Sequence, residues 1–169
     1  MYNIILEIVA ILNIVLINGY GILKKKLSIL VLYWVGVIFA LLYEIHGTGF
    51  QWTYPGYNIY LLYGSIPFAI IFGWNWWIVY IAILSEKIQN KLNIKRWYHP
   101  FITDYLVGCL VGGILENIAV YFDWWVYSNP KPPLLPFISF TVWLGWGIPV
   151  AILIHLVRWV FQNLEYKSL

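Results

Sequence analysis

Five stretches of this 169-residue chain are each long and apolar enough to suggest a crossing of a lipid bilayer. A helix needs about 20 mainly apolar residues to traverse the hydrocarbon core. Hydrophobic residues make up 62% of the sequence and charged residues 10%, whereas soluble domains are roughly half apolar and a quarter charged. The sequence therefore predicts an all-α fold, a polytopic transmembrane helical bundle. The expected spans are residues 2–23, 27–45, 59–84, 101–122 and 137–161.

No long linker divides the chain, and no convincing internal repeat is visible in the sequence. We therefore expect residues 1–169 to form a single transmembrane domain. Pro67 falls within the first half of the third expected span, and proline removes a helical hydrogen bond, so a kink is predicted there.

The basic residues alternate between the connections, which predicts the orientation of the chain. Lys and Arg in short connections resist translocation and therefore mark the cytoplasmic side. Nine of the ten follow the first, third and fifth spans, and only Lys131 lies on the other side. We expect an outside N-terminus, a cytoplasmic C-terminus and a location in the cell membrane. The nine are Lys24, Lys25, Lys26, Lys87, Lys91, Lys95, Arg96, Arg158 and Lys167.

Several classes of binding protein are disfavoured by what the sequence lacks. The net charge of +3 is not arranged as a basic stripe with interleaved aromatic residues, so no nucleic-acid partner is expected. Cys109 is the only cysteine, and there is no His-x-x-x-His or Glu-x-x-His pattern. We therefore expect neither a metal nor a cofactor. The polar residues form no continuous stripe through the spans, which disfavours a channel.

Glu116 is the most suggestive acidic residue, because it lies deep in the fourth span beside Asn117. Ionised side chains inside a membrane are unfavourable and usually face the bundle interior or a cavity. Gly108, Gly112 and Gly113 precede it at helical spacing and allow another helix to approach closely. Glu116 is then either a protonated acid that donates its proton or a neutral side chain that links helices by hydrogen bonds.

Three further ionisable residues are candidates for chemistry. Glu44 ends the second span and is followed by His46, so a carboxylate and an imidazole meet on a turn at the membrane surface. They can act as an acid/base pair or ligate a metal, or Glu44 can simply be hydrated there. Asp104 lies four residues into the fourth span, where it can be catalytic or can stabilise the helix start.

Aromatic residues make up 20% of the chain, more than two interfacial belts require. Trp124 and Trp125 fit such a belt, whereas Trp74 and Trp146 lie within spans. Aromatic faces attract cations, so a cavity walled by these rings and holding one acid suits the protonation of an alkene. The alternative is that the rings only fill space or contact lipid.

Three segments, taken in order, resemble a known family. They are similar to the archaeal and bacterial carotenoid-biosynthesis membrane family that includes bisanhydrobacterioruberin hydratase, although Glu116-Asn117 replaces that family's usual Asp-Pro. The segments are Tyr43 to Phe50 with Tyr54, Gly64 to Phe68 with Trp74, and Glu116 with Trp124, Trp125, Pro136, Gly145 and Trp146.

The resemblance implies a long isoprenoid substrate lying in the bilayer, with Glu44 and Glu116 as candidate acids. The resulting hypothesis is an enzyme of the hydratase or cyclase type that protonates a C=C bond without a cofactor. Glu116 would be the general acid, Glu44 with His46 would position water, and Asp104 is a further catalytic candidate. The substrate-binding candidates are Tyr54, Trp74, Asn117, Trp124 and Trp146.

A second hypothesis belongs to a different class of protein. A chain this short, with almost no mass outside the membrane, also fits a small non-catalytic subunit of a larger membrane complex. Its aromatic faces would then be helix-packing surfaces, and a homo-oligomer is equally compatible with them.

Overall fold

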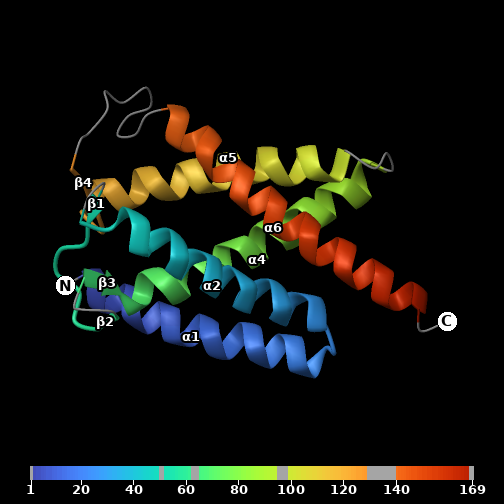
Figure 1. The fold of residues 1–169 in the computed structure, drawn as a ribbon, viewed down its shortest axis with the longest axis horizontal. Coiled ribbons are helices and arrows are strands. Elements are labelled where there is room, and N and C mark those ends of the chain that lie inside the picture. Colours follow the sequence, from blue (N-terminus) through green and yellow to red (C-terminus); the bar gives the residue numbers. More distant parts are fainter. Residues whose placement is uncertain (1, 50–51, 62–64, 95–98, 129–139, 168–169) are drawn as a thin grey trace.

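The computed structural model describes residues 2–49, 52–61, 65–94, 99–128 and 140–167 and is a bundle of long helices (Figure 1). Five of the described helices are long and apolar enough to cross a membrane, which confirms the predicted helical class. The helices are α1 (Tyr2–Leu23), α2 (Leu27–Gly47), α4 (Phe68–Lys91), α5 (His99–Tyr121) and α6 (Phe140–Lys167).

Four two-residue strands, which the sequence analysis did not predict, gather at one end of the bundle. They are β1 (Trp52–Thr53), β2 (Tyr60–Leu61), β3 (Ile66–Pro67) and β4 (Val126–Tyr127). β1 pairs antiparallel with β4, and β2 pairs antiparallel with β3. We call this end of the bundle the strand end; the turn between α1 and α2 lies at the opposite end (Figure 1).

The third expected span began too early. Residues 59–67 contain β2 and β3, and α4 begins at Phe68. Pro67 has extended backbone angles (φ −67°, ψ 140°) and precedes the first helical residue, so it marks the start of the helix and does not kink its interior. The physical reason is that proline supplies no amide hydrogen for a helix and disfavours helical geometry in the residue before it.

The other boundaries differ from the predictions by smaller amounts. α1 agrees with the expected residues 2–23, α2 runs two residues further to Gly47, and α5 covers 99–121 in place of 101–122. α4 and α6 both continue beyond their apolar stretches, to Lys91 and Lys167. The start of the fifth span at residues 137–139 lies outside the described residues.

Glycines allow α5 and α6 to pack closely, as the sequence analysis expected for Gly108 and Gly112. A Cβ atom added to Gly108 would lie 3.1 Å from the Cα of Gly147 on α6. One added to Gly112 would lie 2.6 Å from the Cγ of Trp146. Small residues of this kind are the usual means by which membrane helices approach one another. The contact sets the position of the Trp146 indole.

Candidate functional site

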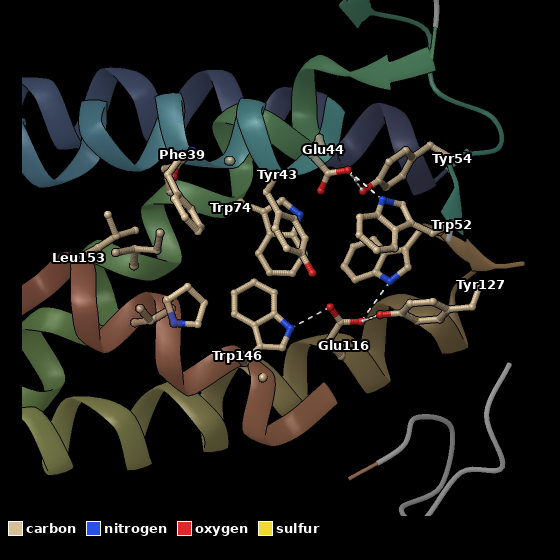
Figure 2. Close-up of a pocket in the computed structure, with 17 residues that line it drawn as sticks. Phe39, Tyr43, Glu44, Trp52, Tyr54, Trp74, Glu116, Tyr127, Trp146 and Leu153 are labelled. Atoms are coloured by element: carbon tan, nitrogen blue, oxygen red, sulfur yellow. Dashed lines mark hydrogen bonds between the residues drawn. The ribbon is translucent and has the colours of Figure 1, made fainter. Parts of the chain in front are cut away.

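A cavity of about 290 Å³ lies among α2, α4 and α6 and reaches the strand end (Figure 2). Its polar end contains two buried carboxyl groups, those of Glu44 on α2 and Glu116 on α5. Its remaining walls are almost entirely aromatic and aliphatic. The structure therefore brings together the two acids that the sequence analysis singled out, although they are 72 residues apart in the chain (116 minus 44).

Glu44 accepts three hydrogen bonds, all on Oε2. The donors are the indole N–H of Trp52 at 2.8 Å, the phenol of Tyr54 at 2.7 Å and the hydroxyl of Thr48 at 3.0 Å. The Trp52 ring packs directly over Gly47, where a Cβ atom would overlap it. None of the described residues donates a hydrogen bond to the other oxygen, Oε1. That oxygen lies away from the three donors (Figure 2).

Glu116 also accepts three hydrogen bonds, but they are divided between its two oxygens. Trp125 donates from its indole to Oε2 at 3.1 Å, and the Tyr127 phenol donates to the same oxygen at 2.8 Å. Trp146 donates from its indole to Oε1 at 2.9 Å. Because both oxygens are already acceptors, the arrangement suits a carboxylate at Glu116. Hydrogen bonds to a charged acceptor are stronger than those between neutral groups.

The same short pattern, Trp-x-Tyr, supplies two donors to each glutamate. In the first copy, at 52–54, the Trp and Tyr follow Glu44 by 8 and 10 residues. In the second copy, at 125–127, they follow Glu116 by 9 and 11 residues. β1 and β4, which carry these segments, pair with Trp52 opposite Tyr127, as a local two-fold relation requires. The two carboxyl groups are thus held by equivalent units.

A tryptophan after each copy extends this repeat. Trp74 lies 30 residues after Glu44 (74 minus 44), and Trp146 lies 30 residues after Glu116 (146 minus 116). Their indole rings stack with centroids 3.9 Å apart and planes 9° apart. The two copies differ in the hydrogen bonds that these two indoles make. The Trp146 indole donates to Glu116, whereas no described donor, including Trp74, reaches Oε1 of Glu44.

In the part of the chain that the structure describes, no basic side chain compensates the two acids. Among the described residues that line the cavity, none is a Lys, Arg or His. Burial disfavours the charged form of each carboxyl group, and a second charge facing the same cavity of low dielectric constant adds to that cost. The pair is therefore best accommodated with one proton bound, one carboxyl neutral and the other ionised.

The phenols of Tyr54 and Tyr127 lie outside the membrane-spanning segments. They stay protonated, and so remain hydrogen-bond donors, over a wide pH range. Burial, followed by the nearby carboxyl charges, raises the pKa of each phenol above its usual value of 10.0. Both phenols are therefore protonated at neutral pH, so each keeps donating to its glutamate.

Asp104 lies outside the cavity, in a separate polar cluster that joins α4, α5 and α6. Its carboxylate forms an ion pair with Arg158, whose Nη1 lies 2.9 Å from one oxygen and 2.7 Å from the other. Ser85 and Gln89 of α4 also donate to it. The second guanidinium nitrogen of Arg158 donates to the carbonyl of Ala82 at 3.1 Å. This cluster is arranged to hold three helices together.

Three other predicted site residues are also absent from the cavity lining. His46 is exposed, and its Nδ1 lies 2.7 Å from the carbonyl oxygen of Leu42. The amide of Asn117 donates to the carbonyl of Gly113 within α5. Trp124 stacks on Phe122 with ring centroids 6.0 Å apart. By contrast, the other substrate-binding candidates, Tyr54, Trp74 and Trp146, line the cavity.

The sequence analysis missed several of the residues that hold the carboxyl groups. Trp52 was not considered, Trp125 was named only in an interfacial belt and in the segment that carries the family resemblance, and Tyr127 was not singled out. The repeated Trp-x-Tyr pattern after each glutamate was the signal that could have found them. No group of three or more His, Cys, Asp or Glu side chains in the described part of the chain is placed to hold a metal ion.

Comparison with known proteins does not assign this arrangement to a family. The chain matches no protein-family model, no curated protein and no solved structure.

Proposed function

We propose that this protein is a membrane enzyme that protonates a carbon–carbon double bond of an isoprenoid or carotenoid, as a hydratase or a cyclase does. The observation that carries the proposal is the pair of buried carboxyl groups at the polar end of one aromatic cavity. Such a pair is able to hold one proton and give it to a substrate, because neither acid has a basic partner there. A purely structural subunit needs no such cavity.

The hydrogen bonds support different roles for the two acids. The residues alone pointed to Glu116 as the general acid, but the open Oε1 of Glu44 favours the reverse assignment. A neutral Glu44 carries its proton on Oε1 and donates it into the cavity, while Oε2 continues to accept its three hydrogen bonds. Glu116 stays ionised and stabilises the positive charge that develops.

The reaction balances without a cofactor. The π electrons of the alkene take the proton from Oε1, which leaves a carboxylate on Glu44 and a carbocation on the more substituted carbon. In a hydratase, water adds to the cation and returns a proton to the carboxylate, so the net change is alkene plus water to alcohol. In a cyclase, a neighbouring C=C bond attacks the cation, and the resulting cation then loses a proton to the Glu44 carboxylate, which restores the acid and gives an isomer.

The aromatic walls suit the cationic intermediate. The faces of Trp and Tyr rings attract cations by about 0.5 to 2 kcal/mol, with the larger values in dry sites. The stacked pair of Trp74 and Trp146 lies beside the acids, and Tyr43 lines the same cavity. These rings contain no strong nucleophile, so they stabilise the cation without trapping it.

The test uses the purified protein in lipid nanodiscs with the acyclic carotene lycopene in deuterium oxide. The expected product carries carbon-bound deuterium and has either gained the elements of water or remained isomeric with the substrate. Glu44→Gln should abolish it, because the amide has no acidic proton. Glu44→Gln also keeps an oxygen for the three donors, so the variant should fold normally.

Two controls distinguish an enzyme from the alternative hypothesis, a non-catalytic subunit of a larger membrane complex. Glu86→Gln alters an acid outside the cavity lining and should leave product formation unchanged. Native mass spectrometry of the gently solubilised protein should show a monomer or homo-oligomer. Partner proteins in fixed stoichiometry, together with undiminished turnover in Glu44→Gln, would overturn the enzyme assignment.

We also propose that the strand end faces the outside of the cell and the C-terminus the cytoplasm. The lysines between α1 and α2 support this orientation, because basic connections stay on the cytoplasmic side. In a background with Cys109→Ala, a membrane-impermeant thiol reagent should label Thr53→Cys in intact cells. Lys25→Cys should react only after permeabilisation, and the opposite pattern would reverse the orientation.

A further inference from the structure

We infer that a linear polyene enters the cavity directly from the bilayer, reactive end first, through a lateral opening between α2 and α6. The inference rests on the proposed function for the identity of the reactive end, but the opening itself is argued from geometry. On this side the cavity is lined by Phe39, Ala40 and Tyr43 of α2 and by Gly145, Pro149 and Leu153 of α6. Figure 2 shows Phe39 and Leu153 on opposite sides of it.

The exposure of the lining residues locates the opening. Tyr43 lines the cavity and is nevertheless 56% exposed, and Phe39 lines it and is 37% exposed. On the opposite edge, a Cβ atom added to the exposed Gly145 would meet none of the described atoms within 4 Å. Side chains that belong both to a cavity and to the outer surface mark the place where the two meet.

The opening faces lipid, because both edges belong to membrane-spanning segments. Phe39 and Tyr43 lie in the candidate span Leu27–Gly47, and Gly145 lies in the candidate span Leu144–Phe161. A molecule that passes between these helices therefore comes from the hydrocarbon region and not from water. An apolar substrate dissolved in the membrane is the class that can use this route.

The size of the cavity indicates that only one end of a long substrate enters. Its volume of about 290 Å³ is at the low end of the range of roughly 300–1,000 Å³ for pockets that enclose small ligands. The acids occupy the far end of the cavity. A long chain would therefore place its terminus at Glu44 and Glu116 and leave the remainder between the helices and in the lipid.

A row of aromatic rings gives one wall of the cavity an apolar surface. Phe39 stacks on Tyr43 with centroids 6.4 Å apart and planes 20° apart, and Tyr43 stacks on Trp52 with centroids 5.5 Å apart and planes 19° apart. The row leads along one wall from the lipid-facing edge to the indole that donates to Glu44. An apolar hydrocarbon chain can lie along this wall, and the proposed function identifies that chain as a polyene.

Gly145→Leu tests the opening with little effect on folding, because the added side chain enters open space at the edge. Gly19→Leu is the matched control, since Gly19 is also a helical glycine with nothing within 4 Å of an added Cβ atom, and it does not line the cavity. The probe is lycopene in nanodiscs. Its induced circular dichroism in the visible band reports a polyene held in a chiral site.

Wild type, Gly19→Leu and the inactive Glu44→Gln should all give the induced signal, and Gly145→Leu should reduce it at least tenfold. An unchanged signal in Gly145→Leu, or no signal in wild type, would overturn the lateral route. Binding without any product in wild type would instead overturn the proposed reaction and leave the route intact.

Discussion

The indole of Trp146 stacks on that of Trp74 and at the same time donates its N–H to Oε1 of Glu116 at 2.9 Å. One side chain therefore forms part of the aromatic wall and also fixes one of the two acids. The close approach of α5 to α6 at Gly112 positions it, since a Cβ atom there would lie 2.6 Å from the Trp146 ring.

Replacing Trp146 with phenylalanine should separate these two roles. Trp146→Phe keeps an aromatic ring but leaves a buried carboxyl oxygen without its donor, which costs about 1–3 kcal/mol. Trp74→Phe is the matched control, because the Trp74 indole donates to neither glutamate. Unfolding of both variants in detergent measures the difference. Equal stability of the two variants would mean that the bond to Glu116 contributes nothing.

The two glutamates should respond differently to replacement by glutamine. In Glu44→Gln the amide oxygen can accept all three hydrogen bonds while the NH₂ group occupies the open position of Oε1. In Glu116→Gln the NH₂ group must face either the indole of Trp146 or the donors on Oε2, and two donors repel.

We therefore expect Glu44→Gln to unfold close to wild type and Glu116→Gln to lose about 1–3 kcal/mol. Adding Trp146→Phe to Glu116→Gln removes the clash and should restore part of that loss, which a thermodynamic cycle in detergent measures. A Glu116→Gln variant as stable as wild type would contradict the hydrogen-bond arrangement described here.

The sequence was sufficient to predict the helices and to single out the two acids that face the cavity, because both follow from the free energy of transfer into lipid. A buried carboxyl group is unfavourable there, which is why Glu44 and Glu116 stood out. The same argument could not separate them from Asp104, because depth in the membrane does not show which partner a carboxylate has. Only the packing of α6 brings Arg158 to Asp104.

The strands were unpredictable for a different reason. β1 and β4 are two residues long and pair across 73 and 75 positions (126 minus 53, 127 minus 52), so no local pattern predicts them. Their aromatic residues looked like ordinary membrane-interface residues. The donors to each glutamate became recognisable only when the strand pair placed them beside the carboxyl groups.

Alkaline pH should destabilise the folded protein through its buried phenols. The pKa values of Tyr54 and Tyr127 are raised in the folded state, so the unfolded chain releases these protons first as the pH increases. Their contribution to stability is complete below the unfolded value of about 10 and declines above it. Thermal unfolding measured between about pH 9 and 11 should show this decline.

The double variant Tyr54→Phe with Tyr127→Phe should show a shallower decline over the same interval than wild type. Tyr20→Phe removes a side chain that is 45% exposed and serves as the control, with the wild-type slope expected. If the double variant loses stability with pH as steeply as wild type, the two phenols are not the groups responsible.

The polar cluster at Asp104 should determine stability and not turnover. Arg158→Met leaves the buried Asp104 carboxylate without its ion-pair partner, and breaking such pairs on one side costs about 3–5 kcal/mol. The side chain of Arg158 is 24% exposed, so the lower end of that range is expected. Adding Asp104→Asn removes the uncompensated charge, and the double variant should be more stable than Arg158→Met alone.

Product formed from lycopene per folded molecule should match wild type in the double variant. If the double variant folds but forms no product, Asp104 has the catalytic role that the sequence first suggested.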